Sequence, residues 1–171
     1  MLHQFKNINT IVLDVDGVLT DGTLLVMPGG LMVRRMNIKD GYALQLAVKK
    51  GYHIAVISGG DSAEVKDRLQ KLGITDVYMK VQDKLSVLNE YMILNGLDLA
   101  TTAYMGDDIP DYDVMKVVGL PACPADAAVE IKSLSAYVSP VNGGAGCVRD
   151  LIEKIMRVRG DWTEDASVRA Q

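Results

Sequence analysis

One short stretch constrains the fold of this chain more than any other: an apolar run that leads directly into carboxylates. Ile11, Val12 and Leu13 precede Asp14, and Asp16 follows two positions later. Such a run predicts a buried strand of a parallel sheet that ends at a polar crevice. Side chains two positions apart on an extended backbone share a face, so both carboxylates are expected to point into that crevice. Taken alone, the segment also fits a solvated, aspartate-rich turn.

The length, charge and cysteine content limit the class of protein. With 171 residues the chain is expected to form one domain, residues 1–171, with a real core. The net charge of −4 offers no basic surface for nucleic acid, and no apolar run is long enough to span a bilayer. The N-terminus lacks the layout of a signal peptide, and Cys123 and Cys147 are too few for a disulfide framework. We therefore expect a cytoplasmic protein that contacts neither nucleic acid nor membrane.

Strand-like and helix-like patterns alternate from residue 8 onward. This alternation predicts an α/β fold, a Rossmann-like parallel sheet with helices on both faces. The expected strands cover about residues 11–14, 53–57, 76–79, 102–105, 119–123 and 136–139. Helical spacing of apolar residues fills the intervals between these strands, and a final helix is expected over about 148–157.

The segment at about residues 22–37 is predicted to form a β-hairpin. Two apolar runs, 23–27 and 31–36, flank Pro28-Gly29-Gly30. Because the hairpin leaves the sheet directly after the paired carboxylates, it is expected to stand over the crevice as a flap. Its runs are more apolar than a solvated hairpin tolerates, so we expect another subunit to cover it. The last dozen residues, about 160–171, are polar and expected to be loose in an isolated subunit.

Three further groups of polar residues follow predicted strands or open predicted helices. Ser58-Gly59 follows a strand, Lys84 lies at a helix start, and Gly106-Asp107-Asp108 follows another strand, with Asp111 shortly after. Taken singly, Ser58 is better explained as an ordinary helix cap and Lys84 as a solvated helix residue. Together with Asp14, these groups are expected to meet where the parallel strands end.

The four motifs, in this order, resemble those of the haloacid dehalogenase superfamily of phosphoryl-transfer enzymes. The first motif runs from Asp14 to Gly22 and has the pattern Asp-x-Asp-Gly-x-x-Thr-Asp-Gly. The resemblance implies that Asp14 attacks phosphorus and forms an aspartyl phosphate. Asp16 would protonate the departing alkoxide and then take a proton from the attacking water. An acid at this position suits the hydrolysis of phosphate esters, so the implied activity is that of a phosphatase.

The same resemblance implies a Mg²⁺ site. Asp14, Asp107 and the backbone carbonyl of Asp16 would supply oxygen ligands and leave room for waters and a phosphate oxygen. Asp108 and Asp111 are expected to support this site, and either one would bond a metal-bound water.

Phosphoryl oxygens are expected to be bound by Ser58, by the N–H of Gly59 and by Lys84, which would add a positive charge opposite the nucleophile. Ser58 and Lys84 therefore count as catalytic residues together with the two aspartates of the first motif.

A capless chain of this size with a hairpin is similar to the 3-deoxy-D-manno-octulosonate 8-phosphate (KDO 8-phosphate) phosphatases of lipopolysaccharide biosynthesis. The similarity covers about residues 11–155. It implies a homotetramer in which the hairpins pack together and a neighbouring subunit, with the tail around Trp162, helps to close each site. It also implies substrate contacts from Arg68 and from the segment Asn37, Ile38, Lys39, Asp40 and Gly41. Arg68 is explained almost as well by a solvated helix residue that pairs with an acid.

The chain departs from these relatives at Gln45, Gly60 and Ala145, where arginine is common. The departures leave the hydrolytic groups intact but remove cations that would hold a substrate carboxylate. A related nine-carbon 2-keto-3-deoxy sugar acid 9-phosphate is therefore the alternative substrate. A phosphoacceptor signalling domain is the alternative from another class. It is disfavoured because Lys84 precedes Asp107, whereas in such domains the lysine comes last.

Overall fold

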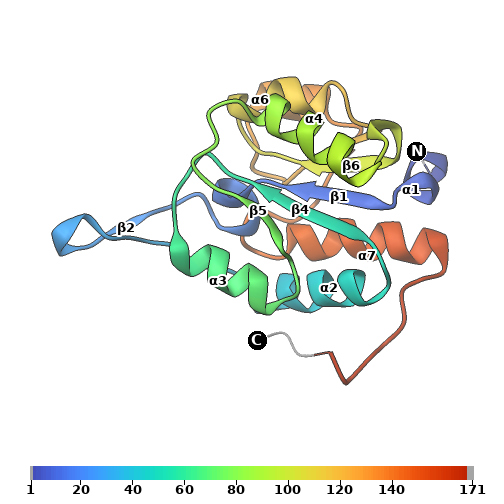
Figure 1. Ribbon diagram of the computed structural model, residues 1–171, viewed down its shortest axis with the longest axis horizontal. Helices are drawn as coiled ribbons and strands as arrows, with labels where there is room; N and C mark the ends of the chain where they lie inside the picture. The colour runs from blue at the N-terminus through green and yellow to red at the C-terminus, as the bar shows by residue number, and fades with distance from the viewer. Residues whose placement is uncertain (1, 169–171) are drawn as a thin grey trace.

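The computed structural model describes residues 2–168, and its centre is a six-stranded, wholly parallel sheet (Figure 1). Across the sheet the strand order is β5-β4-β1-β6-β7-β8. The strands are β1 (Thr10–Leu13), β4 (His53–Ile57), β5 (Asp76–Tyr78), β6 (Thr102–Met105), β7 (Leu120–Cys123) and β8 (Tyr137–Val138). The predicted α/β class and parallel sheet are confirmed.

The order of the strands reverses beside β1. The chain runs from β1 through β4 to β5 on one side, and then crosses to β6 on the other side of β1. Leu13, the last residue of β1, is in register with Val56 of β4 and Met105 of β6, so the three strands end at nearly the same level. Ligands of open α/β sheets bind beyond the strand ends at such a reversal. The topology therefore brings the residues that follow these three strands to one place.

Helices cover both faces of the sheet (Figure 1). Helices α1, α2, α3 and α7 pack on one face, and α4, α5 and α6 pack on the other. Their bounds are α1 (Leu2–Asn7), α2 (Ile38–Lys49), α3 (Ala63–Lys71), α4 (Lys84–Asn95), α5 (Tyr112–Met115), α6 (Val129–Leu134) and α7 (Cys147–Arg159). No helix among the described residues is both long enough and apolar enough to cross a bilayer.

The side chains of β1 belong to two separate cores. Ile11 and Leu13 pack into the core beneath α2 and α7, whereas Val12 packs into the core beneath α4. All three side chains are fully buried, which explains why the strand is a continuous apolar run rather than an alternating one. Burial of each contributes roughly 1.5–3 kcal/mol of transfer free energy. This buried strand fixes the position of the carboxylate that follows it.

A small hairpin follows the first motif, as predicted, although its paired part is short. It consists of β2 (Leu25–Val26) and β3 (Met32–Val33), joined through the turn Pro28–Gly30. Gly29 and Gly30 both have φ above +80°, a conformation that other residues rarely adopt. The hairpin projects from the edge of the sheet at which β1 ends (Figure 1). Its returning arm therefore passes close to the residues that follow β1.

The segment after α7 is packed against its own subunit, so the expectation of a loose tail is wrong for residues 160–168. The Tyr42 hydroxyl donates to the carbonyl of Asp165 and accepts from its N–H, at 3.3 and 3.1 Å. Trp162 packs edge-on against Tyr42, with 6.1 Å between ring centroids, and Arg149 and Arg157 lie over its ring. These contacts outweigh the polar composition of the segment. Residues 169–171 lie outside the described part of the chain.

Candidate active site

One pocket of about 290 Å³ at the carboxyl edge of the sheet contains every residue for which a catalytic or metal-binding role was predicted. Its lining comes from loops after β1, β4 and β6 and from the start of α4. The lining residues are Asp14, Asp16, Gly22, Ser58, Gly59, Gly60, Lys84, Asp107, Asp108, Pro110 and Asp111. The four motifs, although far apart in the sequence, therefore form one site.

Asp14 is buried and directly follows β1. Its Oδ1 accepts a hydrogen bond from the Val15 N–H at 2.7 Å, which fixes the carboxylate at the start of the following loop. That loop turns at Gly17, where φ is +84°. The hydroxyl of Thr20 closes the loop by accepting hydrogen bonds from the N–H groups of Gly17 and Gly22. Asp14 is therefore held rigidly and points into the pocket.

Lys84 is the cation of the pocket floor. It is the first residue of α4, which Asp83 caps by accepting from the Ser86 N–H at 3.0 Å. Its Nζ lies 3.0 Å from Oδ1 of Asp14 and 2.7 Å from Oδ1 of Asp111. Burial alone would lower the pKa of Lys84, but these two carboxylates outweigh it and raise the pKa above its usual value. Lys84 therefore stays charged beside the predicted nucleophile.

Asp111 is fully buried and acts as a support. Its Oδ1 accepts from Lys84 and from the Tyr104 hydroxyl, the latter at 2.6 Å, and its Oδ2 accepts from the Asp107 N–H at 3.1 Å. These bonds orient both the lysine and the loop that carries Asp107. Sequence reasoning missed Tyr104. Its signal is one phenol on an otherwise apolar strand, which is also what an ordinary core residue shows.

The donor set fits a divalent cation. Carboxylate oxygens of Asp14, Asp107 and Asp111 all lie within 4.8 Å of one another. Burial, with the neighbouring Asp111 carboxylate, raises the pKa of both Asp14 and Asp107 to about 7. This clustering of negative charge is what a hard cation with oxygen ligands relieves. Since Asp111 already accepts three hydrogen bonds, Asp14 and Asp107 are the better placed ligands.

Gly17 makes room for Asp107 in this cluster. A Cβ at position 17 would overlap the Asp107 carboxylate, and the positive φ would strain any L side chain there. The glycine of the first motif therefore has a structural reason: it lets the loop after β1 and the loop after β6 approach each other closely.

Asp16, the predicted acid, is paired with an arginine that sequence reasoning missed. Arg34, on the returning arm of the hairpin, donates from Nε to Oδ1 of Asp16 at 2.7 Å and from Nη2 to Oδ2 at 3.1 Å. The only signal in the sequence is a pair of arginines in an otherwise apolar arm. Which of the two faces the site depends on the path of the hairpin.

Ser58, Gly59 and Gly60 line the same pocket. Ser58 follows β4 and is buried, and its hydroxyl accepts from the Gly60 N–H at 3.1 Å. The hydroxyl proton is thus available to an acceptor in the pocket. Gly59 and Gly60 expose backbone at the pocket wall, which suits the binding of phosphoryl oxygens.

The predicted substrate contacts of the 37–41 segment lie apart from this pocket. Asn37 caps α2 and donates to the Gly144 carbonyl, and the buried Asp40 accepts from the Arg149 N–H at 2.7 Å. Lys39 is exposed and Gly41 is buried within α2. The structure therefore does not bring this segment to the catalytic groups within one subunit.

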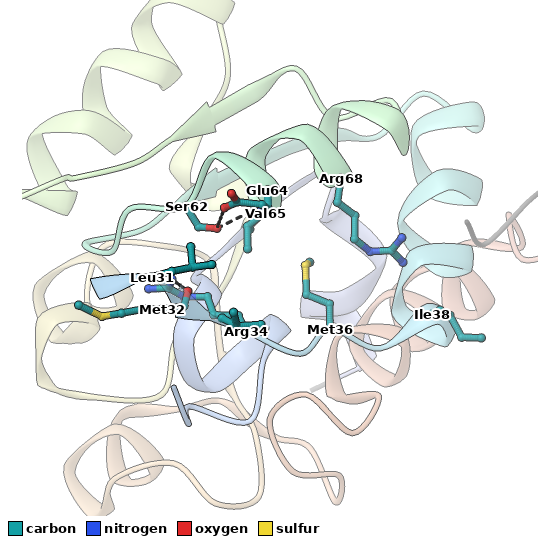
Figure 2. A pocket seen from close by; sticks show the side chains of 10 residues that line it. Leu31, Met32, Arg34, Met36, Ile38, Ser62, Glu64, Val65 and Arg68 are labelled. Carbon is teal, nitrogen blue, oxygen red and sulfur yellow. Dashed lines mark hydrogen bonds between the residues drawn. The ribbon is translucent and has the colours of Figure 1, made fainter. Parts of the chain in front are cut away.

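Ile38 and Arg68 line a second hollow, a groove of about 400 Å³ between the hairpin arm and α3. Figure 2 shows this groove, with Arg34 on the hairpin side and Arg68 on the helix side. Arg34 is thus shared: it lines the groove and it bonds Asp16 of the catalytic pocket. The contacts of Ile38 and Arg68 with a substrate stay predictions.

Known proteins of similar sequence and structure agree with this arrangement, although no protein-family model matches the chain. The chain is 33% identical over 164 residues to the KDO 8-phosphate phosphatase of Escherichia coli K12, covering 96% of this chain and 87% of that one. The crystal structure of the Yersinia pestis phosphatase of the same name superposes with a TM-score of 0.91 at 31% identity, over 94% of this chain and 86% of that one. The Moraxella catarrhalis phosphatase, solved with magnesium, phosphate and KDO, gives 0.90 at 30% identity, over 94% and 92%.

These likenesses span nearly the whole chain, and the pocket holds the complete set of motif residues at the expected strand ends. The chain therefore belongs to the KDO 8-phosphate phosphatase family of the haloacid dehalogenase superfamily.

Proposed function

We propose that this chain is a Mg²⁺-dependent phosphatase that hydrolyses KDO 8-phosphate to KDO and phosphate in lipopolysaccharide biosynthesis. The observation that carries the proposal is the contact of buried Asp14 with Lys84 beside the carboxylate of Asp107. This is a nucleophile held next to a cation and next to a second carboxylate, at the switch point of the sheet. The substrate follows from family membership and from the relatives of that name.

Asp14 is the nucleophile of the proposed reaction. Its carboxylate attacks phosphorus, the bond to the sugar oxygen breaks, and an aspartyl phosphate forms. Asp16 gives its proton to the departing alkoxide and later takes a proton from the water that hydrolyses the acyl phosphate. Water attack regenerates Asp14 and releases inorganic phosphate, so both aspartates return to their starting forms.

Positive charge and hydrogen bonds hold the phosphoryl group against this nucleophile. Lys84 supplies a buried charge, while the Ser58 hydroxyl and the Gly59 N–H are donors on another wall of the pocket. Asp14, Asp107 and the backbone carbonyl of Asp16 would hold Mg²⁺, which when bound neutralises charge on the phosphoryl oxygens. Asp111 orients Lys84, and Asp108 lies at the pocket rim.

We also propose that the chain works as a homotetramer assembled through its hairpins. Seven large apolar side chains of the hairpin are between 40% and 69% exposed in the single chain, which is more than a solvated element tolerates: Leu24, Leu25, Val26, Met27, Leu31, Met32 and Val33. Replacing both Leu25 and Met32 by lysine should dissociate the assembly, which light scattering at micromolar concentration would detect.

The buried, unpaired cysteines Cys123 and Cys147 support the proposal of a reducing, cytoplasmic location.

The substrate is tested by phosphate release from KDO 8-phosphate and from the nine-carbon 2-keto-3-deoxy sugar acid 9-phosphate, each with and without Mg²⁺. We expect the eight-carbon ester to have the higher kcat/KM. The Asp14→Asn variant is expected to bind substrate and release no phosphate. A higher kcat/KM for the nine-carbon ester would replace the substrate but keep the reaction. Turnover by Asp14→Asn, after contaminating wild type is excluded, would remove the nucleophile.

A further inference from the structure

The contact between Arg34 and Asp16 is unusual for a proton donor. Both carboxylate oxygens of Asp16 accept from one guanidinium, at 2.7 and 3.1 Å, in the two-point geometry that arginine makes with carboxylates. A guanidinium keeps its proton throughout the working range of an enzyme. With both of its oxygens engaged by this guanidinium, Asp16 has no free oxygen to place against the leaving-group oxygen of a substrate. The pair must therefore open before Asp16 acts as an acid.

The Arg34 side chain is 5% exposed, yet its hydrogen bonds other than those to Asp16 are long. Beyond Asp16, Arg34 bonds only weakly among the described residues, from Nη1 to the carbonyls of Asp61 and Met32 at 3.4 and 3.5 Å. Its side chain also lines the 400 Å³ groove that adjoins the catalytic pocket (Figure 2). A guanidinium that left Asp16 would thus remain beside this groove, which we take as the space for the organic part of a substrate. A single movement of the Arg34 guanidinium would therefore both release Asp16 and bring the positive charge to the substrate.

Gly60 permits the pair to exist. A Cβ at this position would lie 2.8 Å from Nη2 of Arg34 and 2.8 Å from Oδ2 of Asp16, closer than such atoms approach. Both atoms are ends of movable side chains, so a methyl group here would push them aside without distorting the backbone and would weaken the contact between them. The hairpin arginine therefore occupies space that only a glycine leaves free.

We propose that Arg34 selects substrates that carry a carboxylate: it holds Asp16 in a closed ion pair in the empty site and frees it by exchanging onto the substrate's carboxylate. The inference rests on the proposed role of Asp16 as the acid. A carboxylate is the expected exchange partner because it offers the guanidinium the same two-point bond that it gives up. A phosphate ester of a neutral sugar, called the neutral ester below, has only its phosphoryl oxygens to offer, and these are proposed to be held by Lys84, Ser58 and Gly59, so the acid stays restrained.

The test compares 6-phosphogluconate, which has a carboxylate, with glucose 6-phosphate, which lacks one. The measured quantity is the ratio of their kcat/KM values. For Arg34→Ala we expect this ratio to fall at least tenfold, because hydrolysis of the carboxylate ester weakens while that of the neutral ester holds or rises. Gly60→Ala, which keeps the arginine but parts it from Asp16, should raise kcat on glucose 6-phosphate. Arg35→Ala is the matched control: this neighbouring arginine is exposed and pairs with Asp21, so the ratio should stay unchanged.

A ratio that stays at its wild-type value in Arg34→Ala, whether both activities are kept or both fall by the same factor, would overturn the inference. In an Asp16→Asn background, Gly60→Ala should no longer raise kcat on the neutral ester, and a persisting rise would show that the effect does not pass through Asp16. The proposed function fails separately. A wild type that hydrolyses both esters but not KDO 8-phosphate would refute that substrate and leave the ratio test intact, whereas a wild type inert on all phosphate esters would overturn both proposals.

Discussion

Replacing Lys84 by methionine tests whether the buried charge cluster works as one unit. Methionine keeps an apolar stem of similar length, so the change removes mainly the ammonium group. Lys84 is 7% exposed, and its Nζ bonds two carboxylates of which Asp14 is 7% exposed and Asp111 is fully buried. The variant therefore leaves two buried acids without their shared cation.

The expected cost is large because neither acid can turn to water. Removing one partner of a buried ion pair typically costs about 3–5 kcal/mol, since an uncompensated charge stays behind. Asp14 can offset part of this cost by taking up a proton, because burial and the neighbouring Asp111 already raise its pKa to about 7. We therefore expect a loss of about 3 kcal/mol in the free energy of unfolding, or roughly 6–12 °C in Tm for a chain of this size. Loss of the charge opposite the phosphoryl group should lower kcat by about a hundredfold or more.

Urea unfolding at pH 7 in EDTA, followed by circular dichroism, gives the free energy without a bound metal. Lys116→Met is the control: this exposed lysine pairs with Asp113 at 3.3 Å, and such surface pairs contribute at most about 1 kcal/mol. If Lys84→Met costs no more than Lys116→Met, the cluster does not stabilise the fold. The reasoning from burial would then be wrong, even if activity were lost.

Three other changes test separate parts of the site. Asp16→Asn should lower kcat about a hundred to ten thousand fold on sugar phosphates but less on 4-nitrophenyl phosphate, whose leaving group needs little protonation; equal losses would argue against the acid role. Gly17→Ala should raise the Mg²⁺ concentration for half-maximal activity at least tenfold, because its Cβ would displace Asp107; an unchanged titration would contradict this. Burial raises the pKa of Asp40 to about 6, so the folded state holds this proton more tightly than the unfolded chain and stability falls as pH rises from about 4 through 6. Asp40→Asn should remove about 2 kcal/mol of that fall between pH 4.5 and 7.5, and parallel urea-unfolding profiles for the two proteins would refute it.

The positions of the candidate catalytic groups were predictable because each one is tied to a local pattern. Asp14 directly follows the buried strand β1 and Asp107 comes two residues after the buried strand β6, which leaves little freedom for either carboxylate. Parallel strands also place their carboxyl ends at a common edge. The first residue of a helix is equally constrained, which is why Lys84 lies where the sequence indicated. In these cases the local rule and the fold agree.

What the sequence did not indicate depends on contacts between distant segments. Asp40 lies in the first turn of α2, and its carboxylate is buried against the N-terminus of α7, more than a hundred residues away. The sequence does not indicate which of the adjacent Arg34 and Arg35 faces the site, because the path of the hairpin alone directs Arg34 toward Asp16. The tail is packed because Trp162 contacts Tyr42, Arg149 and Arg157. Only Arg157 is near Trp162 in the sequence.

The loss of an arginine beside Ser58 also has a different meaning in three dimensions. From the sequence, Gly60 indicates a missing cation. In the structure, the same glycine leaves the space that the Arg34 guanidinium enters from the hairpin. The charge at this wall of the pocket is thus supplied by another segment. Counting arginines by sequence position underestimates the positive charge near the substrate.

The rigidity of the pocket depends on a loop that contributes no catalytic group. A Cβ at Gly143 would overlap the carbonyl of Gly17, and Gly144 donates from its N–H to the Val18 carbonyl at 3.0 Å. The loop before α7 thus contacts one side of the loop that follows β1 at Gly17, while the Asp107 carboxylate contacts Gly17 from the other side. Backbone contacts of this kind cannot yield by a change of rotamer, so a side chain at position 143 would move Gly17, and with it the separation of the carboxylates. The three glycines therefore set the geometry of the charge cluster as directly as the aspartates that form it.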